Sequence, residues 1–128
     1  MKILLDTHAF LWWILDLPRL SIRARSAIED KSNIILFSAA GAWEIVIKSQ
    51  LGKITLPDAS DVFIIEQMIV NAFEPLAISI EHVIQLRALP VHHRDPFDRI
   101  MIAQCQAENL LFLTSDPLIK QYSVNTLW

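Results

Sequence analysis

Four carboxylates in four separate segments of the sequence are the residues most able to do chemistry together. They are Asp6, Glu44, Asp98 and Asp116. Carboxylates that gather in one place repel each other unless a cation neutralises them. Oxygen ligands without an accompanying cysteine and histidine set favour Mg²⁺ or Mn²⁺ over Zn²⁺. If the fold brings the four together, they support the chemistry of a divalent metal centre.

The stretch HHRDPFDRIMIAQ, residues 92–104, contains two aspartates three positions apart in front of an apolar run. Asp95, which precedes a proline, is typical of a helix N-cap, and Asp98 could add to that cap from the first turn. However, Asp98 is in phase with Met101 and Cys105, so it heads the stripe expected to face the core. A half-buried charge needs a partner. Asp98 is therefore either part of the cap or a ligand.

The other three carboxylates also have structural explanations. Asp6 could cap the helix that follows it, and Asp116, which precedes a proline, could do the same. Glu44 could pair with Lys48 one helical turn away on the surface. Capping does not explain why Glu44 shares a helix face with apolar residues. Taken together, the four favour one shared site.

Short apolar strands alternate with helices along the chain, which indicates a parallel sheet covered by helices on both faces. The expected strands are 2–5, 33–38, 75–78, 110–114 and 125–127, the last at an edge. The expected helices are 7–15, 21–30, 39–52, about 62–71, one that begins after Ser79, 95–109 and a short one at 116–122.

In such sheets, ligands bind at the carboxyl ends of the strands. Asp6 directly follows the first strand, and Asp116 stands two residues after the fourth. Glu44 lies two turns into a helix on a face with Ala40, Ile47 and Leu51, and this face should be buried. With Asp98 pointing inward from a helix start, all four carboxylates can meet at this edge.

The composition is that of a folded domain with more apolar residues than a small monomer is expected to bury. The 128 residues are 53% hydrophobic, so an oligomer or partner interface is expected. A formal charge of −3 is not the basic balance typical of nucleic-acid binding. The single cysteine, Cys105, is expected in the core of a protein of the reducing cytoplasm. No stretch has the pattern of a membrane span or a signal peptide.

The sequence resembles the PIN-domain ribonucleases, specifically the VapC-type toxins of bacterial toxin–antitoxin pairs. The matching motifs run nearly end to end: LLDTHAFLWW, SAAGAWEIVIKSQLGK, HHRDPFDRIMIAQ, LTSD and NTLW. The third motif, together with the helix that contains WEI, is the most specific. The resemblance implies a single domain over residues 1–128, with a three-layer α/β/α fold around a central parallel sheet. Gly41 stands where relatives often have serine, a departure expected to loosen that helix start.

The resemblance also implies a function, namely Mg²⁺- or Mn²⁺-dependent endonucleolytic hydrolysis of RNA. It assigns Asp6, Glu44 and Asp98 as the core acidic residues and Asp116 as the fourth. The residues expected to have accessory roles or to contact RNA are Asp95, Thr114, Lys48, Arg94 and Arg99. His92 and His93 are expected in a loop, because adjacent side chains cannot share a face in regular structure. The implied partners are a second copy of the chain and a small antitoxin that blocks the site.

Three other classes of α/β domain do not fit. A phosphoacceptor signalling domain needs an adjacent acidic pair early in the chain, and only Asp6 is present there. A haloacid-dehalogenase-like phosphatase needs a second aspartate two residues later, where this sequence has His8. A dinucleotide-binding module needs a glycine-rich turn, which is absent. The remaining alternative is a non-catalytic module that uses the same fold to hold RNA or protein.

Overall fold

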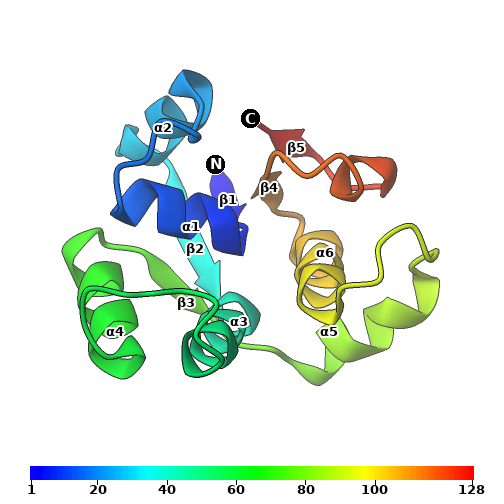
Figure 1. Ribbon diagram of the computed structural model, residues 1–128. Coiled ribbons are helices and arrows are strands. Elements are labelled where there is room, and N and C mark those ends of the chain that lie inside the picture. Colours follow the sequence, from blue (N-terminus) through cyan, green and yellow to red (C-terminus); the bar gives the residue numbers. More distant parts are fainter.

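The computed structural model describes residues 1–128 and contains a five-stranded parallel sheet of order β3-β2-β1-β4-β5 (Figure 1). The strands are β1 (Lys2–Leu5), β2 (Ile34–Ser38), β3 (Glu74–Leu76), β4 (Leu111–Leu113) and β5 (Thr126–Leu127). The helices are α1 (Thr7–Ile14), α2 (Ile22–Glu29), α3 (Ala39–Gln50), α4 (Ser60–Val70), α5 (Ile80–Gln85) and α6 (Pro96–Glu108). Two 3₁₀ turns, η1 (Leu86–Ala88) and η2 (Ile119–Gln121), complete the chain.

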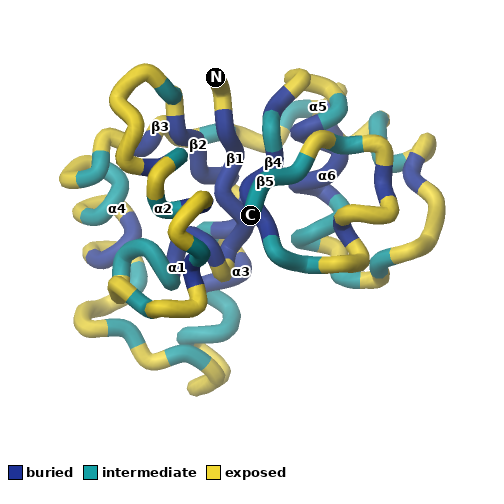
Figure 2. The backbone as a smooth tube through the Cα atoms, turned by 90° about the horizontal axis from the view of Figure 1, so that it is seen from above, coloured by how far each residue is buried: buried dark blue, intermediate teal, exposed yellow.

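Helices cover both faces of the sheet, because successive side chains of a strand point to opposite faces. Ile3 and Leu5 of β1 pack in a core with side chains of α1, α2, α3 and α4. Leu4 points to the other face and packs with α6 and η2. In Figure 2 the three inner strands β1, β2 and β4 are largely buried, whereas the edge strands β3 and β5 are exposed or partly exposed. The expected three-layer α/β/α architecture is confirmed, and no helix is long and apolar enough to cross a membrane.

The sheet has a topological switch point beside β1. The chain adds β2 and β3 on one side of β1, and then returns to add β4 and β5 on the other side. Ligands of open parallel sheets bind where the strand order reverses, outside the carboxyl ends of the strands. Asp6 follows β1 and Thr114 follows β4, so polar side chains occupy both sides of this crevice.

Two local expectations were wrong. Residues 116–122 form only the 3₁₀ turn η2, because the side chain of Asp116 closes a tight turn by accepting from the backbone N of Leu118 at 2.9 Å. The face of α3 that carries Glu44 is buried only in its first two turns. Ala40 is fully buried, whereas Leu51, beyond the last turn, is 64% exposed.

The resemblance led us to expect that Gly41 loosens the start of α3, and this expectation was wrong. The helix begins regularly, with the hydroxyl of Ser38 accepting from the backbone N of Ala40. A Cβ atom at Gly41 would lie 2.7 Å from the ring of Phe37 and 3.3 Å from Oγ1 of Thr7. Glycine therefore permits α3 to pack closely against β2.

Candidate metal centre

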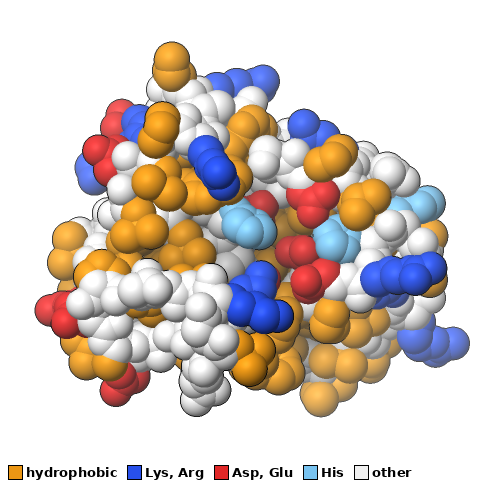
Figure 3. All heavy atoms as spheres, in the orientation of Figure 1, with side chains coloured by type: hydrophobic (Ala, Val, Ile, Leu, Met, Phe, Trp, Pro, Cys, Tyr) orange, Lys and Arg blue, Asp and Glu red, His pale blue; other side chains and the backbone are white.

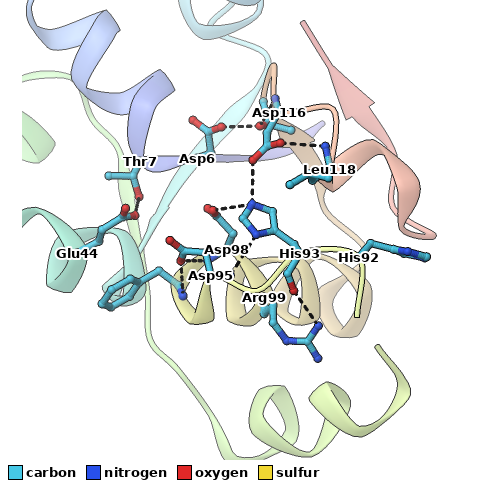
Figure 4. A network of polar contacts seen from close by, with 12 residues as sticks. Asp6, Thr7, Glu44, His92, His93, Asp95, Asp98, Arg99, Asp116 and Leu118 are labelled. Carbon is cyan, nitrogen blue, oxygen red and sulfur yellow. Dashed lines mark hydrogen bonds and ion pairs between the residues drawn. The ribbon is translucent and has the colours of Figure 1, made fainter. Parts of the chain in front are cut away.

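Asp6 lies at the carboxyl end of β1 and serves two purposes there. Its side chain is the N-cap of α1, since Oδ1 accepts from the backbone N of Ala9 at 2.6 Å. Its Oδ2 accepts from the hydroxyl of Thr114, which follows β4 (Figure 4). The residue is only 5% exposed. The capping explanation is therefore correct for Asp6, but it accounts for one oxygen only.

Thr114 connects Asp6 to Asp116. While its hydroxyl donates to Asp6, it also accepts from the backbone N of Asp116 at 3.1 Å. This contact places the Asp116 carboxylate beside the Asp6 carboxylate at the switch point (Figure 4). The predicted accessory residue Thr114 is a fully buried bridge between two of the acidic residues.

Glu44 projects into the same region from α3 and is 3% exposed. Its Oε1 accepts from the hydroxyl of Thr7 at 2.7 Å, and its Oε2 pairs with the ammonium of Lys48. The predicted pairing with Lys48 exists, but it is not a surface pair. Burial would lower the pKa of Lys48, but the hydrogen bond and charge of Glu44, helped by Asp95 and Asp98, outweigh it and raise that pKa.

The sequence left open whether Asp98 belongs to the helix cap with Asp95 or faces the other acidic residues. Asp95 is the N-cap of α6, because its Oδ1 accepts from the backbone N of Phe97 at 2.8 Å and of Asp98 at 3.1 Å. The side chain of Asp98 is 20% exposed and points toward the other acids (Figure 4). Its Oδ1 receives no hydrogen bond from the protein, unlike the carboxylate oxygens of Asp6, Glu44 and Asp116.

The carboxylates are close enough to perturb one another. Burial, followed by the charges of Asp95 and Glu44, raises the pKa of Asp98 to about 7, and the charge of Asp6 adds to the effect. Burial also raises the pKa of Asp6, and the charge of Asp116 contributes in the same direction. Like charges that disfavour each other's ionisation are what a divalent cation would neutralise.

His93 is the residue of this site that the sequence reasoning missed. It lies in a loop, as expected, but its side chain is 11% exposed and turns into the acidic cluster. Its Nε2 is 2.9 Å from Oδ2 of Asp116 and 3.1 Å from Oδ2 of Asp98 (Figure 4). The available signal was its position two residues before the N-cap Asp95, whose backbone N donates to Nδ1 of His93.

The three predicted RNA-contacting residues lie in different environments. Lys48 is part of the cluster through Glu44. The guanidinium of Arg99 binds the neighbouring loop, where it donates to the carbonyl oxygens of Pro90 and His93. It points away from the acidic residues (Figure 4). Arg94 is exposed in that loop. On geometry, Lys48 is the best placed of the three to meet a phosphate.

The donor set fits a hard divalent cation. One polar atom each of His93, Asp98 and Asp116 lies within 4.8 Å of the other two, and further carboxylates approach from Asp6 and Glu44. Carboxylate oxygens are the ligands that Mg²⁺ and Mn²⁺ prefer. Figure 3 shows acidic side chains gathered in a hollow of one face, with histidine and basic side chains around it.

Residues 3–125 match the PIN domain family, so the chain belongs to the PIN domain proteins, as its motifs predicted. In sequence, it is similar to a Mycobacterium tuberculosis protein called Ribonuclease VapC16. The two are 37% identical over 75 residues, which cover 56% of this chain. The same stretch covers 53% of the relative, so the match spans about half of that protein's length.

Solved structures confirm the fold. VapBC2 from Rickettsia felis, bound to a DNA fragment from its promoter, has a TM-score of 0.75 at 15% identity, with 99% of this chain and 98% of that chain covered. DNA-bound VapBC from Salmonella typhimurium has a TM-score of 0.71 at 18% identity, with 99% and 97% covered. At these identities, the likeness establishes a common PIN-like fold.

Proposed function

We propose that this protein is a Mg²⁺- or Mn²⁺-dependent endoribonuclease and the toxin of a toxin–antitoxin pair. The observation that carries the proposal is the convergence of Asp6, Glu44, Asp98 and Asp116 from four segments at the switch point of a PIN fold. The name of the similar protein, Ribonuclease VapC16, supports the reaction. The names of the structural relatives, which are VapBC complexes, support the toxin assignment.

In this mechanism, the four carboxylates would hold the cation. A bound Mg²⁺ or Mn²⁺ supplies Lewis-acid chemistry, because it lowers the pKa of water and offsets charge that develops on a phosphate. Thr114 and the backbone N of Ala9 fix the carboxylate of Asp6, and Thr7 fixes that of Glu44. Preorganised ligands of this kind lose little freedom when the ion binds.

Lys48 supplies the positive charge that an otherwise acidic site needs for an RNA phosphate. Its side chain is 33% exposed and lies beside the buried carboxylate of Glu44. Its ammonium stays charged at neutral pH, because Glu44 raises a pKa that partial burial alone would lower. A phosphate contact of this kind positions the strand without reading its bases.

Two separate apolar faces support the proposed protein partners. On α4, Ile65 and Ile69 are 62% and 74% exposed, and on α5, Ile80 and Ile84 are 72% and 58% exposed. The two helices lie on opposite sides of the molecule in Figures 1 and 2. One face would serve a second copy of the chain and the other an antitoxin, because exposed apolar patches mark interaction sites.

A cleavage assay tests the proposal against a non-catalytic binding module. Purified protein should cut single-stranded RNA with added Mn²⁺ and leave a free 3′-hydroxyl on the 5′ fragment. EDTA should abolish cleavage, and Glu44→Gln should abolish it with Mn²⁺ present. Binding of RNA without cleavage under all conditions would favour the binding module, whereas full cleavage in EDTA would exclude the metal mechanism.

A further inference from the structure

Both ring nitrogens of His93 are engaged (Figure 4). Its Nδ1 accepts a hydrogen bond from the backbone N of Asp95 at 3.1 Å. Its Nε2 faces one carboxylate oxygen of Asp116 at 2.9 Å and one of Asp98 at 3.1 Å. A single imidazole nitrogen therefore joins two acidic residues that come from different segments of the chain.

These contacts define the tautomer of the imidazole. A backbone N–H can only donate, so Nδ1 of His93 must present a lone pair to Asp95. The ring proton of the neutral imidazole then lies on Nε2, where Asp116 accepts it and Oδ2 of Asp98 lies alongside at 3.1 Å. A protonated nitrogen has no lone pair for a metal ion. The backbone contact thus makes His93 a donor to Asp116 and prevents it from acting as a ligand in this arrangement.

We propose that His93 is a positioning residue of the metal centre. Its Nε2–H donates to Asp116 and holds that carboxylate beside Asp98, and His93 does not bind the metal itself. This inference rests on the proposed function, since it concerns the same site. A neutral donor eases the repulsion between the two carboxylates without adding a positive charge that competes with the cation. It also leaves the carboxylate of Asp98, whose Oδ2 is only an ion-pair neighbour of Nε2, open to the cation.

The tautomer and the metal coordination can be read directly by spectroscopy. Long-range ¹H–¹⁵N correlation spectra of the metal-free protein should show His93 with a bare Nδ1 and a protonated Nε2, with His93→Gln used to assign the signals. Pulsed EPR of the Mn²⁺-loaded protein should show no directly coordinated nitrogen. A protonated Nδ1, or a nitrogen bound to Mn²⁺, would overturn the inference.

Titrations with Mn²⁺ alone test the positioning role. Loss of a partner that orients ligands typically weakens metal binding about 10- to 100-fold, and we expect this for His93→Ala. His93→Gln should retain most of the affinity, because its amide N–H can take the place of Nε2–H. The neighbouring His92 is the matched control: it is exposed, its ring packs against Tyr122, and His92→Ala should bind Mn²⁺ as the wild type does.

The outcomes separate this inference from the proposed function. Unchanged Mn²⁺ affinity in folded His93→Ala would overturn the positioning role, and circular dichroism establishes folding. If His93→Ala does not fold, the spectra of the wild type decide the question. No measurement here uses RNA, so a protein that binds Mn²⁺ as described but does not cleave RNA contradicts the proposed function alone.

Discussion

At the scale of single residues, the charge of Asp98 should cost the metal-free protein stability. The pKa of Asp98 is raised from 3.8 to about 7, first by burial and then by Asp95 and Glu44. The folded state therefore binds the Asp98 proton more tightly than the unfolded chain does. The resulting stabilisation is complete below the ordinary pKa of 3.8 and is lost as the pH rises through about 7. In EDTA at about pH 8, Asp98→Asn should therefore raise the melting temperature, because asparagine carries no charge. It should also reduce the additional stability that Mn²⁺ gives by binding the folded state.

Asp95 provides the contrast within the same motif. Its carboxylate caps α6, and losing a cap typically costs about 1 kcal/mol. Asp95→Ala should therefore lower the melting temperature both in EDTA and in Mn²⁺. If Asp98→Asn instead melts lower in EDTA and keeps the full Mn²⁺ shift, then Asp98 acts as a cap and its assignment to the metal centre is wrong.

The raised pKa of Asp98 also predicts how metal binding depends on pH. The cation needs the ionised carboxylate, and it must displace a proton below a pKa of about 7. Mn²⁺ affinity, measured by calorimetry, should fall about tenfold for each pH unit below that value. Affinity that is constant between about pH 5 and 8 would show that Asp98 does not take part.

The sequence predicted the acidic residues of the site but not the residues that position them. Asp6, Glu44, Asp98 and Asp116 were identifiable because charge on a buried face or at a strand end needs an explanation. The roles of Thr7 and His93 depend on contacts across 37 residues to Glu44 and 23 residues to Asp116. A loop residue such as His93 has no periodicity that would indicate where its side chain points.

At the scale of elements, the close packing of α3 on β2 depends on Gly41. The ring of Phe37 lies where a Cβ atom would come, and it is held in place by stacking on Phe10 at 3.9 Å between centroids. Gly41→Ala should therefore lower stability by about 1 to 3 kcal/mol, the usual cost of overpacking, despite its better helix propensity. Denaturant unfolding measures this difference.

Gly52 is the control for Gly41. It has a positive φ of 71° just after α3, and a Cβ atom there would meet nothing within 4 Å. Asparagine tolerates this left-handed conformation, so Gly52→Asn should be nearly neutral. A Gly41→Ala variant as stable as the wild type would show that α3 can move away from β2 without cost.

Most elements were predictable because hydrophobic periodicity and capping residues determine them locally. Ser21, Ser38, Ser79 and Asp95 each cap the helix that follows them. Errors arose where a side chain overrode the local pattern. At 116–122, the carboxylate of Asp116 closes a tight turn and an α-helix does not form. Strand order was not predicted either, because it depends on which strands meet in three dimensions.

At the scale of the whole molecule, the apolar faces on α4 and α5 predict self-association. Sedimentation velocity of the isolated protein should show a dimer, and a charge placed on the self-association face should give monomers. We expect this from either Ile69→Glu on α4 or Ile84→Glu on α5, with the other variant remaining dimeric, because the second face is the one proposed to bind an antitoxin. A wild type that is monomeric at all concentrations would contradict this prediction.

The most direct test of the whole account is the rate of RNA cleavage as a function of free Mn²⁺, measured beside Mn²⁺ binding to the same protein. We expect no cleavage in EDTA and a rate that rises over the concentrations at which the site of Asp6, Glu44, Asp98 and Asp116 fills. Glu44→Gln should lose both binding and cleavage. Cleavage at full rate in EDTA, or cleavage that persists in a variant unable to bind Mn²⁺, would contradict the account.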